Sequence, residues 1–346
     1  MKLSKACLGI DIGSSYIKLV ELRNKGRGSY QLISAHKIDT PDNCLQRSKI
    51  TDEALLANKI SQLLNNANTK TDRVVLGLNS SEVMLKSIAF PKMPQKELDK
   101  VLEFELEDVF KLPSGQSVSD YSISYDILAE TENEMNLLVA GCPMHLVTSY
   151  LNVLRQADLV PFIIDIGAFA LPRVNETTRR SCYVDLGHSQ TVIYIEIDGA
   201  YKVYRILPIG GAAITEGIME AFETEVNHAE NLKLNHDIDY LLMEGSGQKG
   251  LLRATIQQYV GGILQTLDYL RSQFRSSSIN EVLDQVVICG GNAHIKGIDN
   301  LFKQELGMDV IVLEPFSRLQ MIQTTPNDQS IYSTAIGLAL RGLEAP

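Results

Sequence analysis

The feature of this sequence that most limits its possible folds is a turn pattern that occurs twice. Each copy is an apolar strand-like run, an Asp-x-Gly turn, small or polar residues and a second apolar run, at residues 10–15 and 184–189. Each copy stands near the start of a run of three predicted strands. The 346 residues also exceed one typical core and suit two lobes. The sequence therefore predicts a duplicated α/β protein.

The chemistry of the repeated turn favours a phosphate site. Glycine allows a tight turn whose backbone N–H groups can point at an anion, and Ser14, Ser15 and Ser189 add hydroxyl donors. Asp11 and Asp185 would repel a phosphate, but they can hold a Mg²⁺ ion, usually through water, that neutralises the phosphates. Two such turns facing each other across a cleft would hold a triphosphate from both sides. The alternative is two unrelated β-hairpins whose Asp-x-Gly only makes a turn.

A separate block follows the prolines Pro91 and Pro94. It reads as a helix over 95–110, strands at 121–128 and 135–142, and a helix over 144–157, which together predict a small α+β subdomain. One face of the first helix is acidic, and such a run is usually a solvated face. Earlier in the chain, Thr51 is expected to cap a helix that carries an apolar stripe.

Composition excludes several function classes. The formal net charge of −10 disfavours a nucleic-acid surface, which needs a basic stripe. No run of 18 apolar residues exists, so no direct membrane insertion is expected. The five cysteines form no C-x-x-C pair, and three of them sit in apolar runs. These cysteines indicate small buried side chains in a reduced cytoplasm rather than disulfides or a metal site.

Three motifs, in the correct order, resemble the actin, hexokinase and DnaK-type ATPase superfamily. Residues 9–18 are similar to its first phosphate motif, residues 183–191 to its second, and residues 287–293 to its adenosine motif. The resemblance implies an actin-like fold, which is a duplicated ribonuclease-H-like fold with two lobes, and it implies ATP and Mg²⁺ as ligands. The small block would be an inserted α+β subdomain.

The resemblance also implies the site. The expected nucleotide-binding residues are Gly13, Ser14, Ser15, Lys18, Gly187, His188, Ser189, Gln190, Gly210, Gly211, Glu230, Lys233, Gly290, Gly291 and Asn292. Asp11 and Asp185 would hold the metal. Glu230 and Lys233 match the Ala-Glu-x-x-Lys that reaches ribose and base; the alternative is a surface ion pair on a helix. His188 stands where relatives often carry a small residue, so it would contact the γ-phosphate or partly obstruct the site.

Two further segments are similar to the connecting helices of the superfamily. Residues 163–170 match the first, and the acid of that segment, Asp165, would position the attacking water. The alternative is that Asp165 begins a helix and only caps it. Residues 333–339 match the second connecting helix.

The position of the insertion is similar to that in FtsA and in the PilM family. Residues 13–22, 93–98 and 157–161 resemble the PilM family most closely. The sequence stops at Pro346, soon after the second connecting segment. We therefore expect no DnaK-type substrate domain, no amphipathic membrane tail as in FtsA, and no membrane helix as in the L protein of type II secretion.

The resemblance gives expected boundaries. They are 1–93 for the first lobe, 94–159 for the inserted subdomain, 160–180 for the return to the first lobe, 181–320 for the second lobe and 321–346 for the C-terminal helix.

The implied role is an ATP-binding cytoplasmic adaptor of the type IV pilus platform, peripheral to the inner membrane through its partners. It would bind the N-terminal tail of PilN as an extended segment between the first lobe and the insertion. It would help couple the motor ATPases to the platform, with slow or absent hydrolysis. The alternatives are an FtsA-like division or filament protein, or a small-molecule kinase of the hexokinase type, for which no sugar-kinase signature is found.

Overall fold

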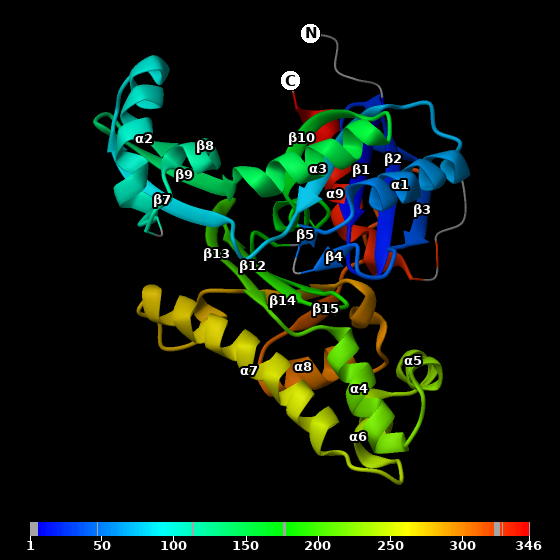
Figure 1. Ribbon diagram of the computed structural model, residues 1–346. Helices are drawn as coiled ribbons and strands as arrows, with labels where there is room; N and C mark the ends of the chain where they lie inside the picture. Colours follow the sequence, from blue (N-terminus) through cyan, green and yellow to red (C-terminus); the bar gives the residue numbers. More distant parts are fainter. Residues whose placement is uncertain are drawn as a thin grey trace.

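Two five-stranded sheets, one above the other in Figure 1, form the body of the protein. This computed structural model describes residues 6–46, 48–112, 114–175, 178–321, 326 and 328–345. The first sheet has the order β10-β6-β1-β2-β3, and the second has the order β13-β12-β11-β14-β15. A three-stranded sheet and a short β4–β5 ladder (Leu45–Gln46 and Lys49–Ile50) complete the strands of the described part.

The first sheet combines an antiparallel hairpin with parallel crossovers. Its strands are β1 (Ala6–Ile12), β2 (Tyr16–Gly26), β3 (Ser29–Asp39), β6 (Arg73–Leu78) and β10 (Val160–Ile166). Strand β1 is antiparallel to β2 and parallel to β6, which is in turn parallel to β10. Helices α1 (Glu53–Ala67) and α3 (Met144–Gln156) cover one face, and α9 (Ser333–Glu344) covers the other. Both faces are covered, which explains why β1 and β6 are nearly continuous apolar runs.

The second sheet repeats this topology. Its strands are β11 (Arg180–Leu186), β12 (Thr191–Ile197), β13 (Ala200–Leu207), β14 (Gln285–Cys289) and β15 (Val310–Val312). Strand β11 is antiparallel to β12 and parallel to β14, just as β1 relates to β2 and β6. The duplicated turn pattern therefore corresponds to a duplicated strand order.

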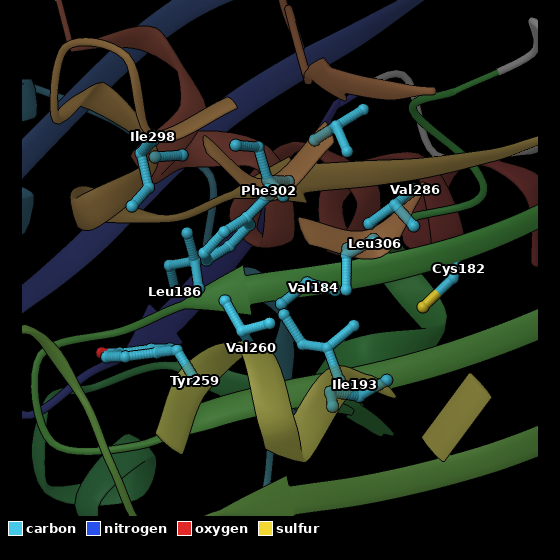
Figure 2. Close-up of a cluster of buried hydrophobic side chains, with 14 of the residues drawn as sticks. Cys182, Val184, Leu186, Ile193, Tyr259, Val260, Val286, Ile298, Phe302 and Leu306 are labelled. Carbon is cyan, nitrogen blue, oxygen red and sulfur yellow. The ribbon is translucent and has the colours of Figure 1, made fainter. Parts of the chain in front are cut away.

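Helices bury one face of the second sheet. They are α4 (Gly211–Phe222), α5 (Val226–Asn235), α6 (Ile238–Met243), α7 (Gly250–Gln273) and α8 (Ile298–Leu306). Figure 2 shows Tyr259 and Val260 of α7 and Phe302 of α8 packed against Val184 and Ile193 of the sheet. The opposite face, with Tyr183 and Tyr194, packs in one cluster with residues of α9 and of the 3-10 helix η2 (Gly167–Ala170). The two lobes thus share a core at their junction.

A small unit stands away from this body (Figure 1). It consists of β7 (Met84–Pro91), α2 (Gln95–Phe110), the 3-10 helix η1 (Val118–Asp120), β8 (Tyr121–Glu130) and β9 (Glu134–Pro143), with sheet order β7-β9-β8. Leu98, Leu102 and Leu106, at i,i+4 spacing on α2, pack on the strands as their own core.

The structure places two segments differently from the expected boundaries of 94–159. Strand β7 precedes residue 94, yet it pairs along its whole length with β9 and so belongs to the small sheet. Helix α3 lies within the expected block, yet its buried Tyr150, Val153 and Leu154 pack in the core of the first lobe. The apolar stripe of α3 packs mainly with α1 and the first sheet, and the small sheet adds only Leu85 and Cys142 at the edge of this cluster.

One expected helix cap is wrong. Asp52, not Thr51, caps α1, because the Asp52 carboxylate accepts a hydrogen bond of 2.9 Å from the Leu55 N–H. The Thr51 hydroxyl instead donates to the carbonyl of Asn43.

Within the described residues, no helix combines the length and the apolar character that a membrane crossing would need.

Candidate nucleotide site

The turns of the two hairpins, β1–β2 and β11–β12, lie against the same cavity. This cavity has a volume of about 700 Å³ and is lined by Asp11, Gly13 and Ser14 of the first lobe and by Asp185 and Ser189 of the second. The Ser189 hydroxyl donates to the Ser14 hydroxyl across 2.8 Å, so the two turns touch. The sequence repeat therefore produces two facing turns, as expected.

The first hairpin carries its own counter-ion. Asp11 of β1 is directly opposite Lys18 of β2, and the Lys18 Nζ lies 2.6 Å from the Asp11 Oδ2. Both side chains are largely buried, with exposed fractions of 13% for Lys18 and 15% for Asp11. The Gly13 N–H donates to the Tyr16 carbonyl at 3.0 Å, and the Thr40 hydroxyl donates to the Gly13 carbonyl at 2.7 Å. The turn is thus stabilised by one hydrogen bond within it and one from Thr40, and the charge of its acid is balanced by Lys18.

The second hairpin leaves its acid without such a partner. Among the described residues, no basic side chain forms an ion pair with Asp185. Burial, and then the like charge of Asp11, raise the pKa of Asp185 to about 6, against the opposing effect of Lys18. A divalent cation between the two carboxylates would relieve this repulsion. No group of three or more His, Cys, Asp and Glu in the described chain forms a metal cage, so such an ion would take its remaining oxygens from phosphate and water.

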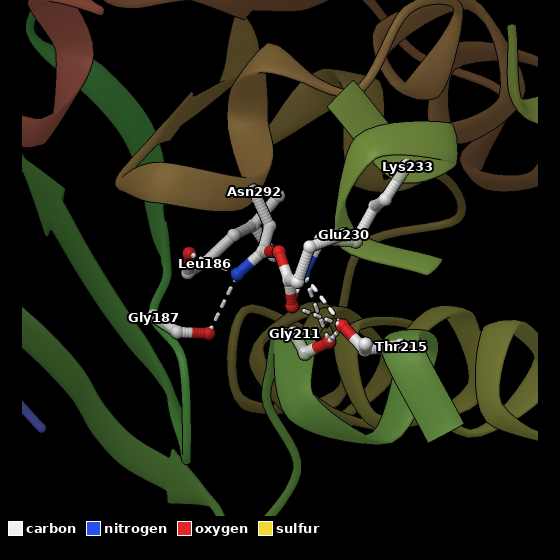
Figure 3. Close-up of polar contacts among 7 residues, drawn as sticks. All are labelled: Leu186, Gly187, Gly211, Thr215, Glu230, Lys233 and Asn292. Atoms are coloured by element: carbon white, nitrogen blue, oxygen red, sulfur yellow. Dashed lines mark hydrogen bonds and ion pairs between the residues drawn. The ribbon is translucent and has the colours of Figure 1, made fainter. Parts of the chain in front are cut away.

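A glycine-rich loop backs the second hairpin. Gly290 has φ 86°, and a Cβ at this position would lie 2.3 Å from the Asp185 Oδ1, so only glycine fits. The Asn292 side-chain amide donates to the carbonyls of Leu186 (3.0 Å) and Gly187 (2.8 Å), as Figure 3 shows for Gly187. The loop predicted for adenosine and the second phosphate turn are therefore one connected unit, and both line the cavity.

Gly210 and Gly211 support the hairpin from behind and do not line the cavity. A Cβ on Gly210 would lie 2.2 Å from the His188 carbonyl oxygen, and the Gly211 N–H donates to the Gly187 carbonyl at 2.9 Å. The prediction placed both glycines in direct contact with the nucleotide; the geometry favours a supporting position, because α4 begins there and closes against the turn.

Glu230 and Lys233 of α5 form a cluster with Thr215 of α4 (Figure 3). The Lys233 Nζ donates to Glu230 (2.7 Å) and to the Thr215 hydroxyl (2.7 Å), which itself donates to Glu230 at 2.5 Å. Burial lowers the pKa of Lys233 despite the charge of Glu230. Burial alone would raise the pKa of Glu230, but hydrogen bonds from Lys233 and Thr215 lower it. Lys233 is only 4% exposed, so this is not a surface ion pair.

The remaining residues of the second hairpin and of α5 complete the wall of the cavity. His188 is exposed and lines it, together with Gln190. Desolvation of the ring and the Lys233 ammonium lower the pKa of His188, against the opposing charge of Glu230, which favours the neutral imidazole. Two exposed apolar side chains of α5, Val226 and Leu234, line the same cavity, where a base would find apolar contacts.

Asp165 is not brought together with the other predicted residues. It lies inside strand β10, so the expectation that it begins a helix is wrong, and the segment after it is only the four-residue η2. The Asp165 Oδ2 accepts from the Arg173 guanidinium at 2.9 Å, and Asp165 does not line the cavity. Its predicted part in positioning water therefore has no geometric support.

Several cavity residues escaped the motif analysis. Ser48, Asn79 and Tyr150 line the cavity from the first lobe, and Asp42 and Ser330 also contribute. Each comes from a different element, and no motif contains them. The polar Asn79 directly after the apolar run of β6 was the one available signal, since parallel strands end at a common edge.

The family is decided by a match along the chain. The family model for "Type IV pilus assembly protein PilM" matches residues 9–343. The chain belongs to the PilM family. A solved PilM-PilN type IV pilus biogenesis complex contains a chain that is 25% identical, with 98% of each chain covered and a TM-score of 0.82.

More distant proteins share the fold of this PilM-family chain. EutJ from Carboxydothermus hydrogenoformans is 13% identical, with 98% of this chain and 92% of that chain covered and a TM-score of 0.57. MreB5 of Spiroplasma citri, solved with AMPPNP, is 11% identical, with 97% and 96% covered and a TM-score of 0.53. The cell division protein FtsA of Buchnera aphidicola is 22% identical over 99% of this chain and 91% of its own length. The predicted actin-like fold and the predicted family are thus confirmed.

Proposed function

We propose that this PilM-family protein is a nucleotide-dependent adaptor that binds ATP with Mg²⁺ in the cleft and the N-terminal tail of a PilN protein on its first lobe. The observation that carries the nucleotide half is the pair of facing turns with Asp11 and Asp185 at one cavity of about 700 Å³. Backbone N–H groups and serines of the turns would hold the phosphates, Asp11 and Asp185 the metal, and α5 the ribose and base. MreB5, of the same fold, was solved with AMPPNP.

ATP would act as a clamp between the lobes with slow or no turnover. Two acids that line the cavity are engaged in ion pairs, Asp11 with Lys18 and Glu230 with Lys233, and a third, Asp185, would be occupied by the metal. Asp165, the acid expected to position water, is held by Arg173 outside the cavity. A bound ligand stabilises the form that it binds by mass action, so ATP can order the two lobes without being consumed.

The partner half rests on an exposed strand edge. Strand β10 ends the first sheet on the side of the small unit (Figure 1), and its sequence Val160–Ile166 is apolar with one acid. Val160 is 53% exposed, and the other six residues of the strand are half-buried. An extended tail adds main-chain hydrogen bonds to such an edge and places alternate side chains in pockets. The neighbouring small unit would supply the other wall of the groove.

The adaptor would sit on the cytoplasmic side of the inner membrane through this tail and would link the platform to the motor ATPases. The distant likeness to FtsA supports the fold. The PilM-PilN complex, at 25% identity over 98% of both chains, supports the pilus assignment.

Excision of the small unit tests the proposal. Residues 84–143 are replaced by a short glycine-serine bridge, which can close because Met84 and Gly141 are paired neighbours on β7 and β9. Helix α3 is retained, since it belongs to the first-lobe core. Fluorescence anisotropy with a labelled PilN tail and calorimetry with Mg-ATP are then compared with the intact protein. ATP affinity should persist while the tail is no longer bound. Retention of the tail would place the partner site elsewhere.

A further inference from the structure

The two residues that follow β6, Asn79 and Ser80, form a junction between both lobes. Asn79 lines the cavity, and Ser80 is only 1% exposed. The Ser80 N–H donates a hydrogen bond of 3.1 Å to the Tyr204 hydroxyl. The same hydroxyl donates a hydrogen bond of 3.3 Å to the Ser80 carbonyl. Tyr204 belongs to β13, one of the two edge strands of the second sheet. A shift of the second lobe relative to the first therefore acts directly on this Asn79–Ser80 junction.

A chain of hydrogen bonds joins the junction to the small unit. The Ser48 hydroxyl donates to the Asn79 carbonyl, and the Tyr150 hydroxyl donates to the Ser48 carbonyl at 3.0 Å. Tyr150 is 2% exposed and sits on α3, which begins at Met144 directly after β9, the central strand of the small sheet. Ser48 has φ 69°, a conformation that non-glycine residues rarely adopt unless the surroundings fix it. Each contact between the junction and α3 is therefore a hydrogen bond between groups whose positions are fixed by the structure around them.

The Asn79 side chain reaches the proposed partner edge. Its Oδ1 accepts from the Ala168 N–H at 3.0 Å, and a Cβ on Gly167 would lie 2.6 Å from its Nδ2. Gly167 and Ala168 open η2, which follows the last residue of β10 without a gap. The end of edge strand β10 is therefore fixed by a side chain that lines the nucleotide cavity.

We propose that the Asn79–Ser80 junction couples nucleotide binding to tail binding, with Tyr150 and Tyr204 as positioning residues on its two sides. Closure of the lobes on Mg-ATP would move Tyr204 against Ser80, and the Asn79 amide would transmit the shift to β10 while Tyr150 transmits it to α3 and the small unit. The inference rests on the proposed function, since it concerns the linkage between its two ligands. Such a coupling must be reciprocal, so the tail also tightens nucleotide binding by the same factor.

The experiment measures the ratio of the Kd of the tail without nucleotide to its Kd with Mg-ATP. The Kd of a labelled PilN tail peptide is determined by fluorescence anisotropy without nucleotide and with saturating Mg-ATP. The ratio is expected to be about fivefold or more in the wild type, the lower end of common allosteric couplings. Tyr150→Phe and Tyr204→Phe each keep the ring and remove only the hydroxyl. Both should lower the ratio to below about twofold, with Mg-ATP at a concentration that calorimetry shows to saturate each variant, because Tyr150 also lines the nucleotide cavity. Tyr259→Phe is the matched control, because Tyr259 is 1% exposed and lies in the core of the second lobe. This variant should keep the wild-type ratio.

Each outcome is decisive. A wild type that binds neither ligand contradicts the proposed function and, with it, the coupling. A wild type that binds both with a ratio of one overturns the coupling alone. Retention of the full ratio in both tyrosine variants overturns the assigned route. Equal loss in Tyr259→Phe would also overturn the route, because a general loosening of the fold would then explain the effect. Two variants on opposite sides of the junction guard against one that fails to fold.

Discussion

The two hairpins share a backbone pattern but differ in charge. In the first, Lys18 lies 2.6 Å from the acid, and the Thr40 hydroxyl holds the turn at Gly13. In the second, Asp185 has no ion-pair partner among the described residues, its pKa is raised to about 6, and the Asn292 amide holds the turn. The two copies have thus kept the geometry of the turn and differ in their electrostatics. The acid of the first turn is already paired with a lysine, whereas the acid of the second is the one that we propose binds a cation most strongly.

The largest effect is expected where the second acid meets its backing glycine. In Gly290→Ala the new Cβ would press on the Asp185 carboxylate in a left-handed conformation, which should lower the free energy of unfolding by about 2–4 kcal/mol. Nucleotide binding should be lost as well. Gly291→Ala is the matched control, since the nearest atom to its Cβ would be 3.9 Å away. Chemical denaturation of both variants checks this; equal destabilisation would show that Gly290 has no special place.

The charge of Asp185 should make stability depend on pH. Its folded pKa of about 6 lies above the ordinary 3.8, so the protonated form favours the fold, and that stability is lost as the pH rises through about 6. Without nucleotide or Mg²⁺, Asp185→Asn should have a higher Tm than the wild type at about pH 8, by on the order of 5 °C, and the difference should shrink toward about pH 4.

Asp11→Asn serves as the contrast in the same thermal scans. It leaves the largely buried Lys18 without its partner, so it should lower the Tm at both ends of the pH range. A Tm gain of Asp185→Asn that does not change with pH would contradict the assigned difference between the two acids.

The supports of the two turns should differ in strength. Asn292→Ala removes two hydrogen bonds, to the carbonyls of Leu186 and Gly187, although Gly187 keeps its bond from the Gly211 N–H, and the change should cost about 2 kcal/mol of unfolding free energy. Thr40→Val replaces the side chain with one of similar shape, removes its single hydrogen bond to the Gly13 carbonyl and should cost about 1 kcal/mol of unfolding free energy. Urea denaturation compares them, and a larger loss in Thr40→Val would reverse the assigned order.

The contact between the two turns should matter least. Ser14→Ala and Ser189→Ala each break the same 2.8 Å hydroxyl pair. Exposed polar pairs contribute little, so each variant should change stability by about 0.5 kcal/mol or less. The double variant should cost less than the sum of the two single variants, because both remove one interaction. Strict additivity in a double-mutant cycle would show that the two turns are not joined in solution.

The sequence alone predicted both turns, the Gly290–Gly291 loop and the Glu230–Lys233 pair, because each is a local pattern whose residues are fixed by one hairpin, loop or helix. It misplaced what depends on distant partners. Asp165 was read from its neighbours as a helix start, but its ion pair with Arg173 and its edge-strand position are tertiary facts.

Other parts had no local signal at all. Ser48, Asn79 and Tyr150 converge from a turn, a strand end and a helix, and no spacing along the chain links them. Strand β7 and helix α3 could not be assigned to a lobe from their own residues either. Their partners, β9 and α1, decide where they pack.

Calorimetric titration with Mg-ATP tests the central claim most directly. The wild type, Asp11→Ala and Asp185→Ala are titrated side by side under the same conditions. We expect both variants to bind more weakly, by about 10-fold for Asp11→Ala, which frees Lys18 to face the phosphates, and by about 100-fold for Asp185→Ala, which has no such compensation. Unaltered affinity in both variants would contradict the account that the two facing turns hold one magnesium-bound triphosphate.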